Sequence, residues 1–169
     1  IPEIGIEVLA DIPAPRLVFV NGRHSPSLSA MDALPDGVSV QLLSDVLAGG
    51  SDSSRFLARR FERHDEIFAR LNSALASEGV LLRAETSAAS GTPLHLVFIG
   101  AEDAADRAWH LRNLIELREG ARLSVVEHHI ASAAGSFRIA VRHVAAHHVT
   151  HNAILGDRFL VRVQRGNGS

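Results

Sequence analysis

The sequence predicts a mainly β protein in which a small α/β region precedes a run of short strands. One long segment has the 3.6-residue apolar period of a helix, whereas the segments after Gly79 alternate with a period of two and are separated by glycine-containing turns. We therefore expect an α/β region over residues 1–79 and strands over residues 80–165. Residues 166–169 are polar and glycine-rich, as in a disordered tail or an expression scar.

The N-terminal region begins with a continuous apolar strand over residues 16–20, which stops at the turn dipeptide Asn21-Gly22. Residues 38–42 predict a second short strand. Residues 44–48 then predict one or two helical turns, closed by a pair of glycines. Short strands and a short helix in this order are typical of a mixed α/β region.

Residues 55–78 predict one long amphipathic helix that ends at Gly79. Apolar side chains and one histidine share a stripe, while arginine and glutamate side chains fall away from it. Because His64 is the only polar member, we expect the stripe to pack in a core rather than to bind a cofactor. The stripe consists of Leu57, Phe61, His64, Phe68, Leu71 and Leu75.

Beyond Gly79 the helical period disappears and short strands follow one another. Phe137, Ile139 and Val141 alternate with polar or small residues, which indicates a strand with one buried face. The strands are predicted over residues 80–85, 94–99, 113–117, 122–128, 137–144, 149–155 and 159–164.

Such a run of strands is compatible with a sandwich, a barrel or a β-helix. A loose recurrence favours the β-helix, because a two-strand unit over residues 113–128, folded about one glycine turn, precedes a similar unit over residues 137–155. One unit cannot bury its apolar face alone. We therefore expect a coil of stacked rungs that continues into a further segment or a partner.

The composition excludes several classes of chemistry. The chain has no cysteine, so it offers no thiolate nucleophile, disulfide or zinc–thiolate site. Neither a P-loop nor a G-x-G-x-x-G motif occurs. A formal charge of −2 supplies no cationic excess for a phosphate backbone, and no run approaches the roughly 18 apolar residues of a membrane helix. We expect a cytoplasmic protein that binds neither nucleic acid nor membrane.

Histidine is concentrated late in the chain, where six of the ten histidines fall within 24 positions. Imidazole binds zinc, iron, copper or nickel, and Glu127, His129, His147 and His151 are candidate ligands of one metal ion. We favour a plainer interpretation, in which these are half-exposed strand residues, because motifs such as H-E-x-x-H are absent. His143 continues an apolar face and is expected in the core.

Six segments, taken in order, carry a resemblance to a known family. They are RLVFVNGR (16–23), LPDGV (34–38), FARLNSAL (68–75), EGVLLR (78–83), TPLHLVF (92–98) and RNLIELREGARLSVVEH (112–128). Together they resemble the SufB/SufD family of iron–sulfur cluster assembly proteins, and its SufD branch in particular. The similarity covers about residues 16–128 and loosens past Gly135. The absence of cysteine agrees better with SufD than with the thiolate-bearing SufB.

The resemblance implies a right-handed parallel β-helix, preceded by a partly helical region and followed by a helical C-terminal domain that this sequence lacks. It implies a non-catalytic scaffold of the SUF machinery that pairs with a SufB-like paralogue and, through the missing domain, with a SufC-like ATPase. It implies that this chain binds no cofactor itself and that the iron–sulfur cluster belongs to the assembled complex. No family site residue falls on matching positions, and a homodimer in isolation stays open.

Two other functions remain as alternatives. The first is a small β-rich metal-dependent enzyme, in which the cluster of Glu127, His129, His147 and His151 holds an ion that activates water. The second is a stand-alone β-helical binding module with capped ends.

Overall fold

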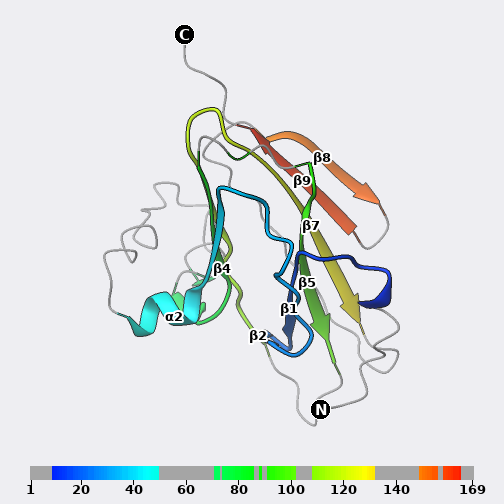
Figure 1. The fold of residues 1–169 in the computed structure, drawn as a ribbon. Helices are drawn as coiled ribbons and strands as arrows, with labels where there is room; N and C mark the ends of the chain where they lie inside the picture. The colour runs from blue at the N-terminus through cyan, green and yellow to red at the C-terminus, as the bar shows by residue number, and fades with distance from the viewer. Residues whose placement is uncertain are drawn as a thin grey trace.

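The structure is a computed structural model that describes residues 9–49, 71–72, 74–85, 88, 91–101, 108–131, 149–155 and 158–164. These residues form mainly β structure in two sheets (Figure 1). No helix in the described part of the chain is long and apolar enough to cross a membrane.

The larger sheet has the strand order β2-β1-β5-β7-β9-β8 and the smaller one has the order β3-β4-β6. A short helix, α2, follows β3 directly. The elements are β1 (Arg16–Val20), β2 (Arg23–His24), β3 (Val38–Leu42), α2 (Leu43–Ala48), β4 (Val80–Ala84), β5 (Leu94–Gly100), β6 (Leu114–Leu117), β7 (Arg122–Ala131), β8 (Val149–Leu155) and β9 (Arg158–Gln164).

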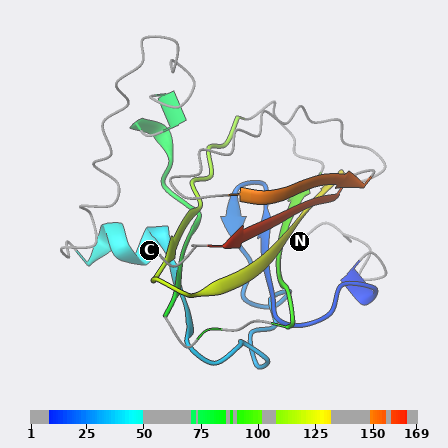
Figure 2. The same cartoon turned by 90° about the horizontal axis from the view of Figure 1, so that it is seen from above.

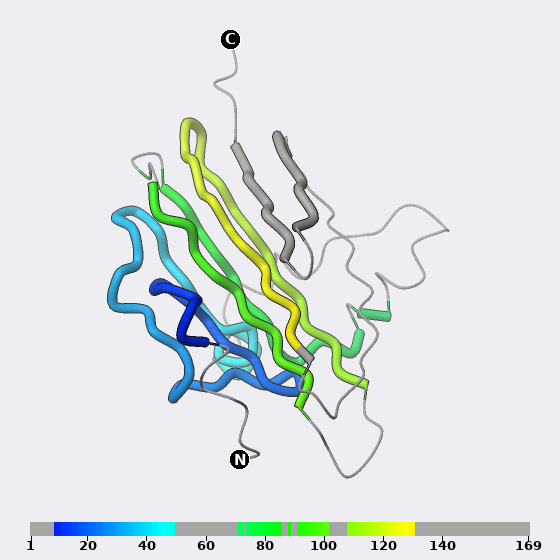
Figure 3. Tube along the Cα trace, turned by 90° about the vertical axis from the view of Figure 1, so that its right-hand side faces the viewer, coloured from blue at the N-terminus to red at the C-terminus, as the bar shows by residue number. Residues whose placement is uncertain are grey.

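From β4 to β7 the chain alternates between the two sheets, and each pass lies beside the previous one. β6 pairs in parallel with β4 in the smaller sheet, and β7 pairs in parallel with β5 in the larger sheet. β1 extends the larger sheet in parallel with β5, so that β1, β5 and β7 run side by side (Figure 3). An ion pair of 2.8 Å between Arg83 and Glu116, which are in register, joins β4 to β6.

The main core lies between the two sheets. Leu17 and Leu96 of the larger sheet and Leu82 of the smaller one belong to the same buried cluster. A second cluster covers the opposite face of the larger sheet, where Leu9 and Ile12 pack on Val18, Val97 and Ile99. Strand β5 is consequently buried over its whole length.

Two glycines permit close approaches that a side chain would block. Asn21 and Gly22 both have positive φ angles, of 47° and 75°, which suits the two-residue turn of the β1–β2 hairpin. A Cβ atom on Gly22 would collide with the side chain of Trp109. Gly79 has a φ of 143°, and a Cβ atom there would overlap the backbone of Arg112.

The edge of β1 is covered by the chain that follows β2. Arg16 exchanges two backbone hydrogen bonds with Ala30, and the Ser29 hydroxyl accepts a hydrogen bond of 3.0 Å from the Val18 N–H. The guanidinium of Arg16 also donates to the carbonyl oxygens of Ile12 and Leu28, at 2.6 and 3.2 Å. These contacts leave little of the β1 edge open to another strand.

The sequence located eight of these strands to within three residues at either end, and it located the short helix to within one residue. These eight strands and the helix are confirmed. The ninth predicted strand, over residues 137–144, lies outside the described residues together with His143. The two-residue strand β2 was not predicted.

The long helix over residues 55–78 is not shown. Residues 55–70 lie outside the described part of the chain, and helical structure is described only at residues 71–72 and 74–75. The predicted end at Gly79 is wrong, because Glu78 forms a β-bridge with Leu111 and the Gly79 carbonyl accepts a hydrogen bond from the Leu43 N–H. Pairing with β3 and with the segment before β6 thus takes these residues out of any helix.

A right-handed parallel β-helix is not shown either. The expectation that the second two-strand unit repeats the first fails in its described part, because β8 does not stack in parallel on the earlier strands. Instead β9 pairs antiparallel with β7, and β8 pairs antiparallel with β9 (Figure 2). The described strands therefore form two mixed sheets. The division of the chain at residue 79 stays a prediction.

Candidate functional site

Strand β7 carries polar side chains on both of its faces. Its register with β5 aligns His128 with Val97 and His129 with Phe98. Successive residues of a strand point to opposite faces, so Glu127 and His129 share the face that looks into the main core, and His128 lies on the other face. The strand therefore brings two separate polar pairs into the interior.

The core-facing pair joins a carboxylate to an imidazole. Glu127 Oε2 lies 3.4 Å from His129 Nε2, and each side chain is only 9% exposed. A contact of this length is at the long end of hydrogen bonding. A buried carboxylate needs such a partner because an unpaired charge in the interior is strongly destabilising. The pair has the groups needed to hold a proton or to supply two ligands to a metal ion.

The ring of His129 is the end of a row of aromatic side chains that crosses four strands. It stacks on Phe98 with the ring centroids 5.0 Å apart, and Phe98 stacks on Phe19 at 5.6 Å. At the other end, Phe19 meets His24 at 5.8 Å in a tilted arrangement. The row fixes the plane of the His129 ring.

The second pair consists of two histidines on adjacent parallel strands. His95 Nδ1 lies 2.8 Å from His128 Nε2, and the two residues are 7% and 4% exposed. Such a bond needs one nitrogen to donate and the other to accept, so at least one of the two rings is neutral. It is a cross-strand link between β5 and β7 inside the protein.

The proposed metal ligands are brought together only in part. Glu127 and His129 are in contact, whereas His147 lies outside the described residues. His151 is on β8, where its backbone pairs with Arg162, while Glu127 pairs with Phe159. Among the residues that the structure describes, no three histidine, aspartate or glutamate residues are arranged to hold a metal ion. The four-residue metal site remains a prediction.

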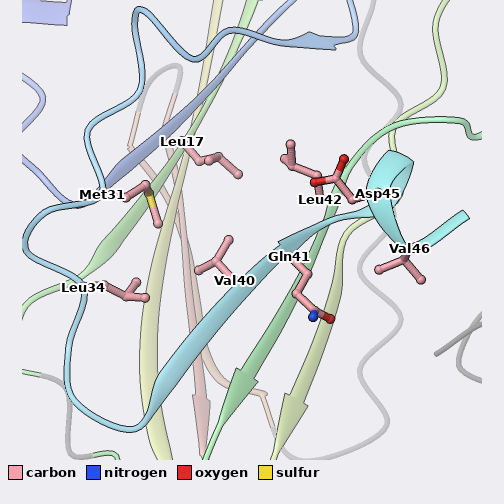
Figure 4. Close-up of a pocket in the computed structure, with 8 residues that line it drawn as sticks. All are labelled: Leu17, Met31, Leu34, Val40, Gln41, Leu42, Asp45 and Val46. Atoms are coloured by element: carbon pink, nitrogen blue, oxygen red, sulfur yellow. The ribbon is translucent and has the colours of Figure 1, made fainter. Parts of the chain in front are cut away.

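An apolar groove of about 440 Å³ lies beside β3, and we call it the β3 groove. Leu17 of the larger sheet faces Val40 across it, with Met31 and Leu34 along the far wall (Figure 4). Its volume is in the range of small-ligand sites, and its lining is mostly hydrophobic. The groove is lined by Leu17, Met31, Leu34, Val40, Gln41, Leu42, Asp45 and Val46.

Sequence reasoning missed the His95–His128 pair and the β3 groove. His95 was placed on a strand correctly, but its partner is known only from the parallel register of β5 and β7. The alternation of apolar and polar residues from Val38 to Leu42 signals a strand with one exposed face, and this is the only trace of the groove in the sequence.

Comparison with known proteins gives one informative similarity. No family model matches the chain. An iron–sulfur cluster assembly protein of the SufBD family from Synechocystis sp. is 25% identical over 113 residues, which cover 66% of this chain and 25% of that protein. The chain thus spans about a quarter of the length of this curated relative. The similarity supports the SufB/SufD family and does not separate SufD from SufB.

Proposed function

We propose that this chain is part of a non-catalytic scaffold subunit for iron–sulfur cluster assembly, in the SufD branch of the SufB/SufD family. The observation that carries the proposal is the similarity over about two thirds of the chain to a protein named for that assembly process. The segments quoted from the sequence fall in the same part of the chain, between residues 16 and 128.

The arrangement of β4 to β7 supports a stacked-coil architecture. Two passes of the chain alternate between the sheets and pair in parallel with one another, which is the way a solenoid buries a face that one repeat cannot bury alone. We propose that these passes are rungs of a right-handed parallel β-helix. Antiparallel β9 beside β7 is then the place where regular stacking stops in the larger sheet.

The side-chain chemistry also supports a scaffold. A chain without cysteine has no thiolate with which to hold a cluster, and it has no lysine and no P-loop for nucleotide phosphates. In this proposal sulfur chemistry belongs to a SufB-like paralogue and ATP hydrolysis to a SufC-like ATPase in the cytoplasm. The cluster forms on the assembled complex, and the lack of cysteine favours SufD over SufB.

Co-purification of the full-length gene product with the SufB-like and SufC-like proteins of the same source tests the proposal. We expect one complex that contains all three proteins, with its mass read by size-exclusion chromatography and light scattering. If the product elutes alone while the other two still assemble with each other, the scaffold proposal is wrong.

A second function is kept because Glu127 and His129 are in contact at 3.4 Å. In that alternative the pair supplies two ligands of a catalytic metal ion. Metal analysis after purification without a histidine tag distinguishes the two functions. Stoichiometric metal that is lost in His129→Ala and kept in His110→Ala would favour the enzyme, whereas near-zero metal in the unaltered protein excludes it.

A further inference from the structure

Strand β3 is an open edge of the smaller sheet. The order β3-β4-β6 leaves one side of β3 without a neighbour among the described strands. Hydrogen bonds from Leu43 N–H to Gly79 and from Glu85 N–H to Gly37 fix which residues bond to β4. In an antiparallel pair the bonding residues alternate, so both backbone groups of Val40 and the N–H of Leu42 point outward from the sheet. The carbonyl oxygen of Leu42 is used otherwise, because Leu42 is the N-cap of α2 and its C=O accepts from the first turn of that helix.

The edge of β1 and the edge of β3 differ in how their backbone groups are covered. Residues 25–30 cover the edge of β1, whereas the described residues give neither the outward groups of Val40 nor the N–H of Leu42 a hydrogen-bond partner. The strand reads Val-Ser-Val-Gln-Leu and has no charge and no proline. Natural sheets usually protect an exposed edge with charged residues or proline. An edge of five residues without either one indicates an edge that pairs with a strand of another molecule.

The β3 groove runs beside this edge and is lined by the same residues. Val40, Gln41 and Leu42 all line the groove, and the side chains of Val40 and Gln41 point in different directions (Figure 4). A strand added to β3 would bond to the N–H and C=O of Val40 and to the N–H of Leu42. The side chains of the added strand on the same face would then enter the groove beside Met31 and Leu34.

We propose that the edge of β3 binds an extended segment of a partner protein by strand addition, with alternate apolar side chains in the β3 groove. Among the described residues that line the groove, Asp45 alone is charged, so the segment carries a lysine or arginine next to it. A second copy of this chain fits less well, because its β3 edge strand carries no cation to pair with Asp45. The inference stands independently of the scaffold proposal.

The test uses the full chain and a fluorescein-labelled heptapeptide that alternates valine with threonine and has lysine at both ends. A twin peptide with glutamate at both ends is the control. We expect the lysine peptide to bind, as read by fluorescence anisotropy. We expect the glutamate peptide to bind about fivefold more weakly, which is the effect of a surface ion pair.

Amide hydrogen exchange locates the bound peptide. Saturation with the lysine peptide is expected to slow the exchange of the Val40 and Leu42 amides, which point outward. The Gln41 amide already bonds to β4 and serves as the internal control. Slowed exchange elsewhere on the protein, with no change at Val40 and Leu42, would overturn the proposal.

Two variants distinguish strand addition from nonspecific peptide binding. Val40→Pro removes an outward N–H that β4 does not use, and proline is tolerated at such an edge position. We expect it to weaken peptide binding about tenfold, the effect of one lost hydrogen bond. Asp45→Arg is expected to reverse the preference, so that the glutamate peptide binds better.

Each result decides the proposal. Binding that Val40→Pro weakens and that Asp45→Arg re-directs supports it. If Val40→Pro fails to fold, the exposed Asp45→Arg variant still gives the answer. Absence of binding by the lysine peptide, or binding that both variants leave unchanged, would overturn it.

Discussion

Strands β5 and β3 differ in burial and in pairing. Every residue of β5 is buried, and the strand has a neighbour on each side. In β3 buried or half-buried residues alternate with exposed ones, and one edge has no neighbour among the described strands. The difference teaches that stability is concentrated around β5, while β3 keeps backbone groups available for recognition.

The largest effect is expected from removing a side chain of β5. Leu96→Ala leaves a cavity between the two sheets and is expected to lower the free energy of unfolding by about 2–5 kcal/mol. Gln41→Ala on β3 should change it by less than about 0.5 kcal/mol, because that side chain is exposed. Urea denaturation measures both. Equal effects of the two substitutions would contradict the contrast between the strands.

The next largest effect is expected at Gly79, where the chain passes close to the backbone of Arg112, just before β6. Gly79→Ala forces a Cβ atom into the backbone of Arg112 at a φ of 143° and is expected to cost about 1–3 kcal/mol. Gly49→Ala is the matched control, since Gly49 has a φ of −75° at the end of α2. Thermal unfolding compares the two variants, and a Gly79→Ala protein as stable as the control would show that the approach is not tight.

The buried histidine pair gives an effect of similar size that is more diagnostic. His128→Phe leaves His95 without its 2.8 Å partner and is expected to cost about 1–3 kcal/mol. Replacing both histidines with phenylalanine removes both polar groups and is expected to cost less than the single change. A double-mutant cycle in urea measures the coupling. Additive costs would mean that the two rings do not depend on each other.

The smallest effect is expected where β1 is protected. Ser29→Ala removes the acceptor of the Val18 N–H and is expected to cost about 0.5–1.5 kcal/mol. Ser27→Ala, on the exposed part of the same loop, is the control and should be close to neutral. Faster hydrogen exchange of the Val18 amide in the first variant alone would show that Ser29 closes this edge.

The sequence predicted correctly those elements that neighbouring residues determine, and it failed where residues distant in the sequence determine the structure. The span of β5 and of β3 is encoded in runs of neighbouring residues, so alternation and apolar runs locate them well. The end of the long helix failed because distant partners, Leu43 and Leu111, pair with Glu78 and Gly79. The helical period of the sequence gives no information about whether distant residues will pair with the end of the helix.

The candidate site divides along the same line. Glu127 and His129 are two residues apart on one strand, so the sequence alone puts them on one face. The His95–His128 pair depends on the register of two strands, and the antiparallel addition of β9 separates His151 from Glu127. Neither the register of β5 with β7 nor the pairing of β9 with β7 can be read from the local sequence pattern.

Iron and sulfide analysis of the reconstituted complex tests the scaffold account most directly. The full-length product is mixed with the SufB-like and SufC-like proteins, a cysteine desulfurase, cysteine and ferrous iron, and each purified species is analysed. The account predicts clusters on the complex that contains all three subunits, and none on this subunit alone. Stoichiometric iron on the isolated subunit, or equal cluster formation when this subunit is left out, would contradict the account.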